Sequence, residues 1–250
     1  RFYVENIPQL PLQEGQWRVL PNKTLEYRLL ETEKPGSGCI PDIEIVVPRL
    51  KYLMIINKTT DVSLHSVTLA HTEWELTAKP QGTWRERTGF NTVGGSGPLP
   101  VDTQMILAWE ADHLRIDNCT VEHGGATGLY VAHSTDVSVA RSIWNDFGAS
   151  AITTAVTDNA LVSNCIIQRP GQLWKQGLGV EFGHCTNATV THCDLSQHPS
   201  DGVSFSGVNL TINNTAGTTN DDILMSGSGM SLSGTLTVTR GNMDLGTNNI

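Results

Sequence analysis

Four stretches of this chain decide its fold: "LRIDNCTVEH" (114–123), "VSVARSIWND" (137–146), "ALVSNCIIQR" (160–169) and "ATVTHCDLSQ" (188–197). When they are aligned, one position holds a small residue at spacings of 23, 23 and 28 residues, namely Cys119, Ser142, Cys165 and Cys193. Three residues earlier stand Ile116, Val139, Val162 and Val190, and two residues later stand Val121, Trp144, Ile167 and Leu195. "DVSLHSVTLAH" (61–71) fits the same frame, with Val67 at the small-residue position. A repeat of about 23 residues therefore organises the middle of the chain.

A second apolar series accompanies the first. Its members are Ile106, Leu129, Ile152, Val180 and Val203, separated by 23, 23, 28 and 23 residues. Two series with matching intervals predict a coil of short parallel strands, in which each turn stacks on the last at ~4.8 Å. We therefore predict an all-β fold, a right-handed single-stranded parallel β-helix. The alternative, a β-sandwich, requires hairpin turns between antiparallel neighbours and does not explain the regular spacing.

Composition supports this fold class and excludes some partners. Only 16% of the 250 residues are charged, 24 are glycine, and no long window has apolar residues at helical spacing. The net charge of −9 argues against a nucleic-acid partner, which needs clustered Lys and Arg. No apolar run approaches the ~18 residues of a membrane-spanning helix. The five cysteines lack CxxC spacing, so we predict no metal site, and we predict no cofactor.

The repeat divides the chain into three segments. Residues 1–50 lie outside it, contain short β-like pieces and are predicted to form an N-terminal β cap over the first turn. Residues 51–215 form the turns of the coil. Residues 216–250 are β-rich but do not match the repeat, which leaves open a degenerate last turn, another β module or a junction. The chain opens at Arg1 without a methionine, as expected for a mature form or a fragment.

Two insertions interrupt the repeat at the same corner, at about 72–104 and 169–177. Because insertions in repeat proteins often line the functional face, we expect them to border a groove. The position four residues beyond the small-residue column holds His71, His123, Asp146, Arg169 and Gln197. Side chains at one position of a coil form a line, so these polar groups predict a binding floor. Trp84 and Trp174, one in each insertion, offer flat faces to sugar rings.

Each of these residues also has a purely structural interpretation. Asp146 and Arg169 can form a surface ion pair contributing ~0–1 kcal/mol. His71 and His123 can cap strand ends, and the two tryptophans can anchor their loops. Cys119, Cys165 and Cys193 are predicted to fill an interior column as compact hydrophobic residues. A disulfide between Cys165 and Cys193 is the alternative, because parallel strand spacing lies within the range that disulfides tolerate.

Six N-x-Ser/Thr sequences favour a secreted glycoprotein if the source is a eukaryote. They begin at Asn22, Asn57, Asn118, Asn187, Asn209 and Asn213.

Five short motifs carry a family resemblance: "YVEN" (3–6), "EGQW" (14–17), "VVPRL" (46–50), "LAHTEW" (69–74) and "NDFGASAI" (145–152). In this order they resemble secreted right-handed β-helix proteins of the pectate-lyase-like superfamily. The nearest likeness is to glycoside hydrolases that include α-L-fucosidases and xylanases, over roughly residues 1–207. The resemblance implies an extracellular carbohydrate-active protein and points to Asp146 in "DFGAS". Where such proteins have a further carboxylate, this chain has Gln197, with Asp194 and Asp201 nearby.

Three functional hypotheses follow. In a glycoside hydrolase, Asp146 is one catalytic carboxylate and Glu122 or Asp201 the other, since such enzymes need two carboxyl groups at a defined spacing. His71, His123, Arg169 and Gln197 then orient a polysaccharide or glycan. The second hypothesis is a non-catalytic structural or glycan-binding β-helix, which Gln197 favours. The third, a calcium-dependent lyase, requires clustered acidic ligands and a basic proton abstractor. Self-assembly stays open.

Overall fold

The computed structural model describes residues 9–34, 43–73, 104–173, 175, 177–206, 209–213, 223–224, 236–240 and 243–244. The chain divides into two compact units, Arg1–Val46 and Val47–Ile250.

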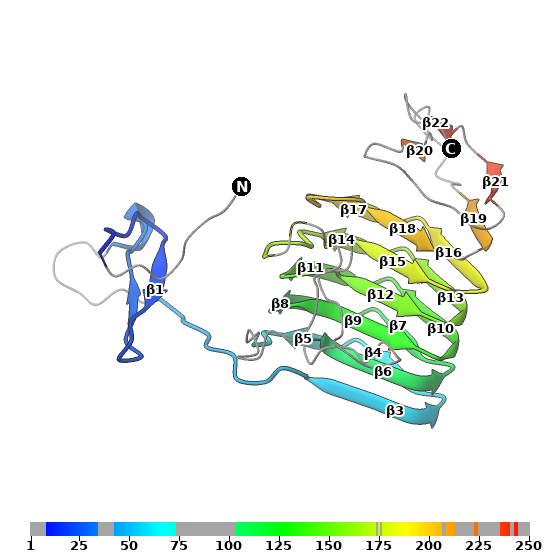
Figure 1. Cartoon of the computed structure of the whole chain (residues 1–250), viewed down its shortest axis with the longest axis horizontal. Coiled ribbons are helices and arrows are strands. Elements are labelled where there is room, and N and C mark those ends of the chain that lie inside the picture. Colours follow the sequence, from blue (N-terminus) through cyan, green and yellow to red (C-terminus); the bar gives the residue numbers. More distant parts are fainter. Residues whose placement is uncertain are drawn as a thin grey trace, which may run out of the picture. The chain divides into compact units, whose positions relative to one another are not determined.

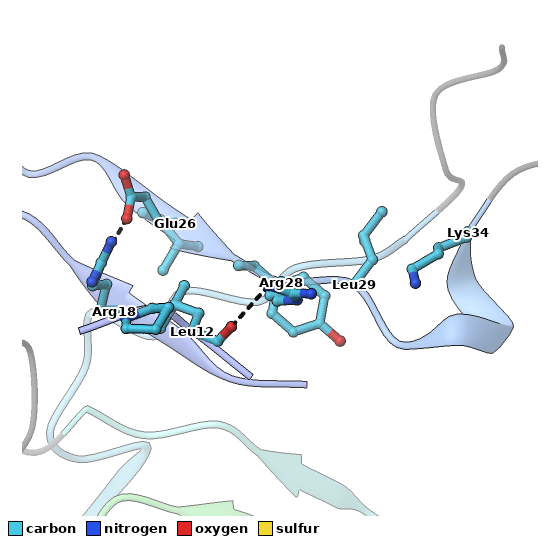
Figure 2. A pocket seen from close by; sticks show the side chains of 9 residues that line it. Leu12, Arg18, Glu26, Arg28, Leu29 and Lys34 are labelled. Carbon is cyan, nitrogen blue, oxygen red and sulfur yellow. Dashed lines mark hydrogen bonds and ion pairs between the residues drawn. The ribbon is translucent and has the colours of Figure 1, made fainter. Parts of the chain in front are cut away.

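The first unit contains a short antiparallel hairpin of β1 (Trp17–Val19) and β2 (Leu25–Tyr27), followed by a 3₁₀ turn, η1 (Glu31–Glu33). Arg18 Nε donates to Glu26 Oε2 at 2.6 Å across the hairpin, and Tyr27 Oη donates to Glu33 Oε2 at 2.6 Å. These strands border a hollow lined by Leu12, Arg18, Glu26, Arg28, Leu29 and Lys34, among others (Figure 2). The capping role of residues 1–50 stays a prediction.

The second unit is a coil of parallel strands arranged in three sheets (Figure 1). The six-stranded sheet contains β3 (Met54–Thr60), β6 (Gln104–Asp112), β9 (Thr127–Ala132), β12 (Ile152–Ala155), β15 (Val180–Gly183) and β18 (Val203–Ser206). The seven-stranded sheet contains β4 (Ser63–His65), β7 (Arg115–Asp117), β10 (Thr135–Ala140), β13 (Asp158–Ser163), β16 (Asn187–Thr191), β19 (Asn209–Asn213) and β21 (Leu236–Arg240). The five-stranded sheet contains β5 (Thr68–Ala70), β8 (Thr120–Gly124), β11 (Ile143–Phe147), β14 (Ile166–Gln168) and β17 (Asp194–Ser196). Along the chain, successive strands of a turn belong to the six-stranded, the seven-stranded and then the five-stranded sheet.

The strand register confirms the predicted parallel β-helix and both apolar series. Ile106 pairs with Leu129, Leu129 with Ile152, Ile152 with Val180, and Val180 with Val203. Val139 likewise lies between Ile116 and Val162, and Trp144 between Val121 and Ile167. In-register stacking explains why the two series share their spacings, since a shift by one residue would turn every apolar side chain outward.

These ladders form the core inside the coil. Trp144, Phe147 and Phe182 are its largest fully buried side chains, and the Phe182 ring stacks on Phe205 with centroids 5.1 Å apart. Aromatic side chains of this size bury 150–250 Å² each, so they supply much of the hydrophobic stabilisation of the coil. Trp144, placed in the core from its ladder position, is confirmed there.

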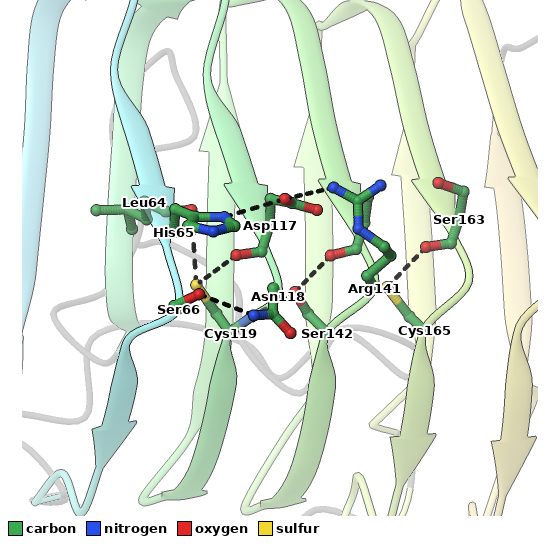
Figure 3. Close-up of polar contacts among 11 residues, drawn as sticks. Leu64, His65, Ser66, Asp117, Asn118, Cys119, Arg141, Ser142, Ser163 and Cys165 are labelled. Carbon is green, nitrogen blue, oxygen red and sulfur yellow. Dashed lines mark hydrogen bonds and ion pairs between the residues drawn. The ribbon is translucent and has the colours of Figure 1, made fainter.

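Cysteines fill small interior positions at two corners. Cys119, Ser142 and Cys165 lie on successive turns (Figure 3). Cys119 and Cys165 are buried and Cys193 is half-buried, which confirms the predicted column. The thiols of these three residues donate to the carbonyls of Asp117, Ser163 and Thr191, and Ser142 Oγ donates to Ala140 O in the same way. Cys185 ends a second column at another corner, formed with Ala111, Ser134 and Thr157. All four described cysteines are free thiols.

The corners of the coil are turned by non-glycine residues in the left-handed backbone region. Their φ values lie between 48° and 67°, and they recur turn after turn. Asn, Asp and His tolerate this region better than most residues, and His and Asp are prominent here. The four columns are Lys58, Glu110, His133, Val156, His184; Asp61, His113, Asp136, Asn159; Ser66, Asn118, Arg141, Asn164, His192; and His71, His123, Asp146, Arg169, Gln197.

Strands beyond residue 206 extend the coil. β21 pairs in parallel with β19, and the register shifts between Ile212 and Asn213. β20 (Ile223–Leu224) and β22 (Met243–Asp244) form a separate parallel pair. The described part of 216–250 therefore includes a continuation of the seven-stranded sheet.

Candidate functional site

The corner between the five-stranded and the six-stranded sheet carries both long connections. Residues 71–103 connect β5 to β6, whereas only residues 125–126 connect β8 to β9. Residues 169–179 connect β14 to β15. The second connection is tied to the preceding turn, because Gly171 N, Gln172 N and Leu173 N donate to the carbonyls of Ala149, Phe147 and Gly148. We call this corner the loop corner.

The loop corner presents one polar side chain per turn, each on a left-handed residue just after or within a strand end. These are His71, His123, Asp146, Arg169 and Gln197, which we call the loop column. Pairing of Glu122 with Asn145 and of Asn145 with Gln168 places His123, Asp146 and Arg169 at equivalent positions. The sequence therefore aligns these side chains because the backbone repeats, independently of their own contacts.

Direct contacts run along the loop column from His71 to Arg169. The His71 and His123 rings stack with centroids 4.8 Å apart and an interplanar angle of 8°. His123 Nδ1 lies 2.8 Å from Asp146 Oδ2, and Arg169 Nη2 lies 3.7 Å from the same oxygen. The surface ion pair considered for Asp146 and Arg169 is thus present. It is half-exposed, so its contribution to stability is ~0–1 kcal/mol.

Glu122 approaches the other side of the His123 ring. Its Oε2 lies 3.8 Å from His123 Nε2. The side chains of Glu122, His123 and Asp146 retain 30%, 38% and 32% exposure, so a ligand can reach all three. Asn145, which pairs with Glu122 in the sheet, accepts a hydrogen bond from Arg169 Nε at 3.1 Å.

This geometry organises acid–base chemistry around one imidazole. A carboxylate at Nδ1 favours the tautomer that carries its proton there, which directs Nε2 toward Glu122. Protonation of Nε2 would instead place a cation between two carboxylates. At 3.8 Å, Glu122 Oε2 and His123 Nε2 are neighbours beyond hydrogen-bond distance, at a half-exposed surface that a substrate can reach.

The other predicted site residues lie elsewhere at the loop corner or outside the described part of the chain. Gln197 continues the loop column and is exposed, and Asp201 is half-buried in the connection between β17 and β18. Trp84 and Trp174 lie outside the described residues. The catalytic and binding roles of all these residues stay predictions.

Thr72 is a structural residue of the corner that the sequence pattern did not indicate. It is buried, its Oγ1 accepts from Gly125 N at 3.1 Å, and its N–H donates to His123 O at 3.2 Å. These bonds fix the backbone beside His123. Its position directly after His71, the first member of the loop column, is the one sequence feature that could have pointed to it.

A second polar group projects from the outer face of the six-stranded sheet. Tyr130, Thr153 and Glu181 are paired in register, between inward residues of the ladder. Burial raises the pKa of Tyr130, and the nearby Glu181 carboxylate raises it further. The Tyr130 hydroxyl therefore stays protonated well above neutral pH and is available as a hydrogen-bond donor.

The described sequon asparagines Asn22, Asn57, Asn118 and Asn187 are exposed. Asn118 Nδ2 donates to Ser66 Oγ at 2.8 Å, and Asn187 Nδ2 donates to Asn159 Oδ1 at 2.8 Å. Asn209 and Asn213 bound β19, and their side chains lie outside the described part. Glycosylation at all six positions stays a prediction.

Two features are absent from the described part of the chain. No group of three or more His, Cys, Asp or Glu side chains is placed to hold a metal ion. Within the same residues, no helix has the length and apolar character needed to span a membrane.

Comparison with known proteins gives one result. The model of the family described as "Right handed beta helix region" matches residues 104–243, more than half of the chain. No curated protein and no solved structure matches the sequence.

Proposed function

The chain belongs to the right-handed β-helix family, and we propose that it is a secreted, glycoside-hydrolase-like protein that binds a glycan along the loop column. One observation carries this proposal: His123 lies between two carboxylates, 2.8 Å from Asp146 and 3.8 Å from Glu122, at a half-exposed corner. Glycoside hydrolysis uses two carboxyl groups that flank the scissile bond, and this corner supplies two of them on adjacent turns.

In this proposal Glu122 exchanges a proton with the glycosidic oxygen or with water, and His123 serves as its proton partner. Asp146 is the second carboxylate and is oriented by His123 and Arg169. Asp201, the other candidate, lies in the connection between β17 and β18, two turns beyond Asp146. An imidazole between the carboxylates favours the wider spacing of inverting enzymes, ~6.5–9.5 Å, over the ~5–5.5 Å of retaining enzymes.

The rest of the loop column suits a ligand rich in hydroxyl groups. His71, Arg169 and Gln197 offer donors and acceptors in a line on successive turns. Trp84 and Trp174 are proposed to stack on sugar rings from the two insertions, as aromatic faces do with flat apolar surfaces. Secretion and glycosylation belong to the same proposal and rest on the family resemblance and the sequons.

A panel of plant and microbial polysaccharides tests this function through two measurements, the release of reducing ends and the retention of protein on the immobilised polysaccharide. We expect one class of glycan to be bound and cleaved. E122Q and D146N should each lower cleavage about 100-fold or more, as expected for loss of general acid–base catalysis. D136N is the matched control, because Asp136 is also a carboxylate on a left-handed corner residue.

A non-catalytic glycan-binding or structural β-helix is the second candidate. It is favoured because Asp146 already has His123 and Arg169 as partners, and because an amide, Gln197, ends the loop column. Retention of the protein without release of reducing ends would support this candidate over hydrolysis. If no glycan in the panel is bound or cleaved, hydrolysis and glycan binding are both wrong, and the structural β-helix is the candidate that stands.

A further inference from the structure

Two cysteines meet on adjacent turns inside the coil. Val162 pairs with Val190 and Ile166 pairs with Asp194, so Cys165 and Cys193 occupy equivalent positions on neighbouring turns. Cys165 N donates to Cys193 Sγ at 3.5 Å. Neighbouring parallel strands lie ~4.7–4.9 Å apart, which is within the Cα separation of 4.4–6.8 Å usual for disulfides.

No other described pair of cysteines has this relation. Ser142 occupies the turn between Cys119 and Cys165, and Cys185 belongs to the separate column with Ala111, Ser134 and Thr157. The other two described thiols therefore serve as internal controls.

From this geometry we propose that Cys165 and Cys193 form a site of reversible disulfide formation that joins two turns of the coil. The disulfide closes a covalent loop from Cys165 to Cys193, and this loop includes the long connection 169–179. It forms when a small-molecule disulfide, such as oxidised glutathione, reaches the half-buried Cys193.

The reaction proceeds by two thiol–disulfide exchanges. The Cys193 thiolate attacks one sulfur of the glutathione disulfide, the bond between the two glutathione sulfurs breaks, and one glutathione thiolate leaves. Cys165 then loses its proton and attacks the Cys193 sulfur, which expels the second glutathione. Two protein thiols become one disulfide, and one glutathione disulfide is reduced to two thiols.

The burial and the pKa of the two cysteines determine which thiol reacts first. Cys193 is half-buried, whereas Cys165 is buried, so the oxidant meets Cys193 first. The neighbouring Cys165 thiol, a potential hydrogen-bond donor to the Cys193 thiolate, lowers the pKa of Cys193. The hydrogen bonds with Cys165 N–H and the Thr191 backbone lower it further, against the effect of burial. The same pairing raises the pKa of Cys165. Cys165 is thus the resolving thiol, and it becomes reactive once Cys193 has formed the mixed disulfide.

The test treats the full chain with oxidised glutathione and maps its peptides without reduction. We expect a cross-linked peptide pair containing Cys165 and Cys193, two hydrogens lighter than the reduced peptides. The midpoint of thermal unfolding should rise by about 5–10 °C relative to the reduced protein. Dithiothreitol should reverse both changes.

Single serine variants separate this pair from the other thiols. C165S and C193S should lose the cross-link and the rise in midpoint, whereas C119S and C185S should keep both. Serine is already present in this column as Ser142, so the fold should accept it. The proposal fails if the wild-type map shows no Cys165–Cys193 peptide, if Cys193 carries only glutathione, or if C193S keeps the rise in midpoint.

Discussion

Two histidines in this coil occupy nearly the same chemical setting at different corners. His123 lies in the loop column between Glu122 and Asp146, at 3.8 and 2.8 Å. His113 lies between Asp61 and Asp136, at 3.1 and 3.4 Å, where the chain passes from the six- to the seven-stranded sheet. Both have left-handed backbones. The two carboxylates near His113 come from the turns before and after it, whereas Glu122 directly precedes His123 and only Asp146 belongs to a neighbouring turn.

The difference lies in what surrounds each histidine. His113 belongs to a ladder that Asn159 and Asn187 continue, with Asn159 Nδ2 donating to Asp136 at 2.9 Å and Asn187 Nδ2 to Asn159 at 2.8 Å. We call Asp61, His113, Asp136, Asn159 and Asn187 the closed column, because the side chain of each member contacts that of the next through a hydrogen bond or an ion pair. Among the described turns, no long connection leaves this corner, whereas residues 71–103 and 169–179 leave the loop corner. An Asp–His contact in this coil therefore follows from the stacking of equivalent positions on successive turns and is not by itself a sign of catalysis. What distinguishes His123 is its position at the corner from which the two long connections leave.

The largest expected effect separates the two histidines by activity. H123N should lower glycan cleavage about 100-fold or more, because it removes the proposed proton partner of Glu122. H113N should leave cleavage unchanged. Both variants should unfold within about 1 kcal/mol of wild type, because asparagine tolerates the left-handed backbone. The measurements are initial rates on the cleaved glycan and urea unfolding. Equal loss of activity in both variants would show that the setting of His123 is not special.

The second prediction concerns backbone packing at the same two corners. A Cβ added to Gly128, where the chain enters the six-stranded sheet from the loop corner, would lie 2.6 Å from Ala151 O and 2.6 Å from the Phe147 ring. Such overpacking should make G128A less stable by about 2 kcal/mol or more. A Cβ on Gly183, at the exit of the sheet, would be 3.4 Å from Thr154 O, so G183A should unfold within about 0.5 kcal/mol of wild type. Equal denaturant midpoints for the two variants would contradict this difference between the corners.

The third prediction tests whether the left-handed corners need polar side chains. Val156 has φ 51° and is exposed, although a β-branched residue is strained in this region. V156N should stabilise the protein by about 1 kcal/mol, because asparagine accepts the conformation and little apolar burial is lost. Thermal unfolding measures the gain. V67N is the control: Val67 is also an exposed valine but is not among the left-handed residues, so no gain is expected. A loss of stability in V156N would mean that Val156 packing outweighs its backbone strain.

The sequence predicted the fold well because stacking repeats the same position on each turn. The intervals that placed Ile106 above Leu129 reappear as strand pairs, and Trp144 is in the core as expected. The closed column carries the same signal and was missed, since His113, Asp136 and Asn159 are also 23 residues apart and Asn187 follows after 28. Its residues are polar and lie at a corner that has no insertion, so neither the apolar series nor the insertions pointed to them.

The candidate site was predictable only in outline. The spacing placed His71, His123, Asp146 and Arg169 in a line, but the hydrogen bond between His123 and Asp146 depends on side-chain rotamers and on the left-handed backbone. Glu122 was considered for its nearness to Asp146. The His123 ring between the two carboxylates could not be inferred, because sequence spacing fixes Cα positions and not side-chain directions.

The smallest expected effect is the acid response of the closed column. The hydrogen bond with His113 holds the pKa of Asp61 below its ordinary value of 3.8, and Thr60 and the charge of Arg115 add to this. A carboxyl group with a lowered pKa stabilises the folded state above its unfolded pKa, and this contribution is lost as the pH falls through the folded value. The wild type should therefore exceed D61N slightly in unfolding midpoint at pH 5, and the two should converge as the pH falls below the ordinary value of 3.8. Because Asp61 is exposed, added salt should shrink the difference at pH 5. A difference that persists at pH 2 would assign the stabilisation to packing of the column and not to the charge of Asp61.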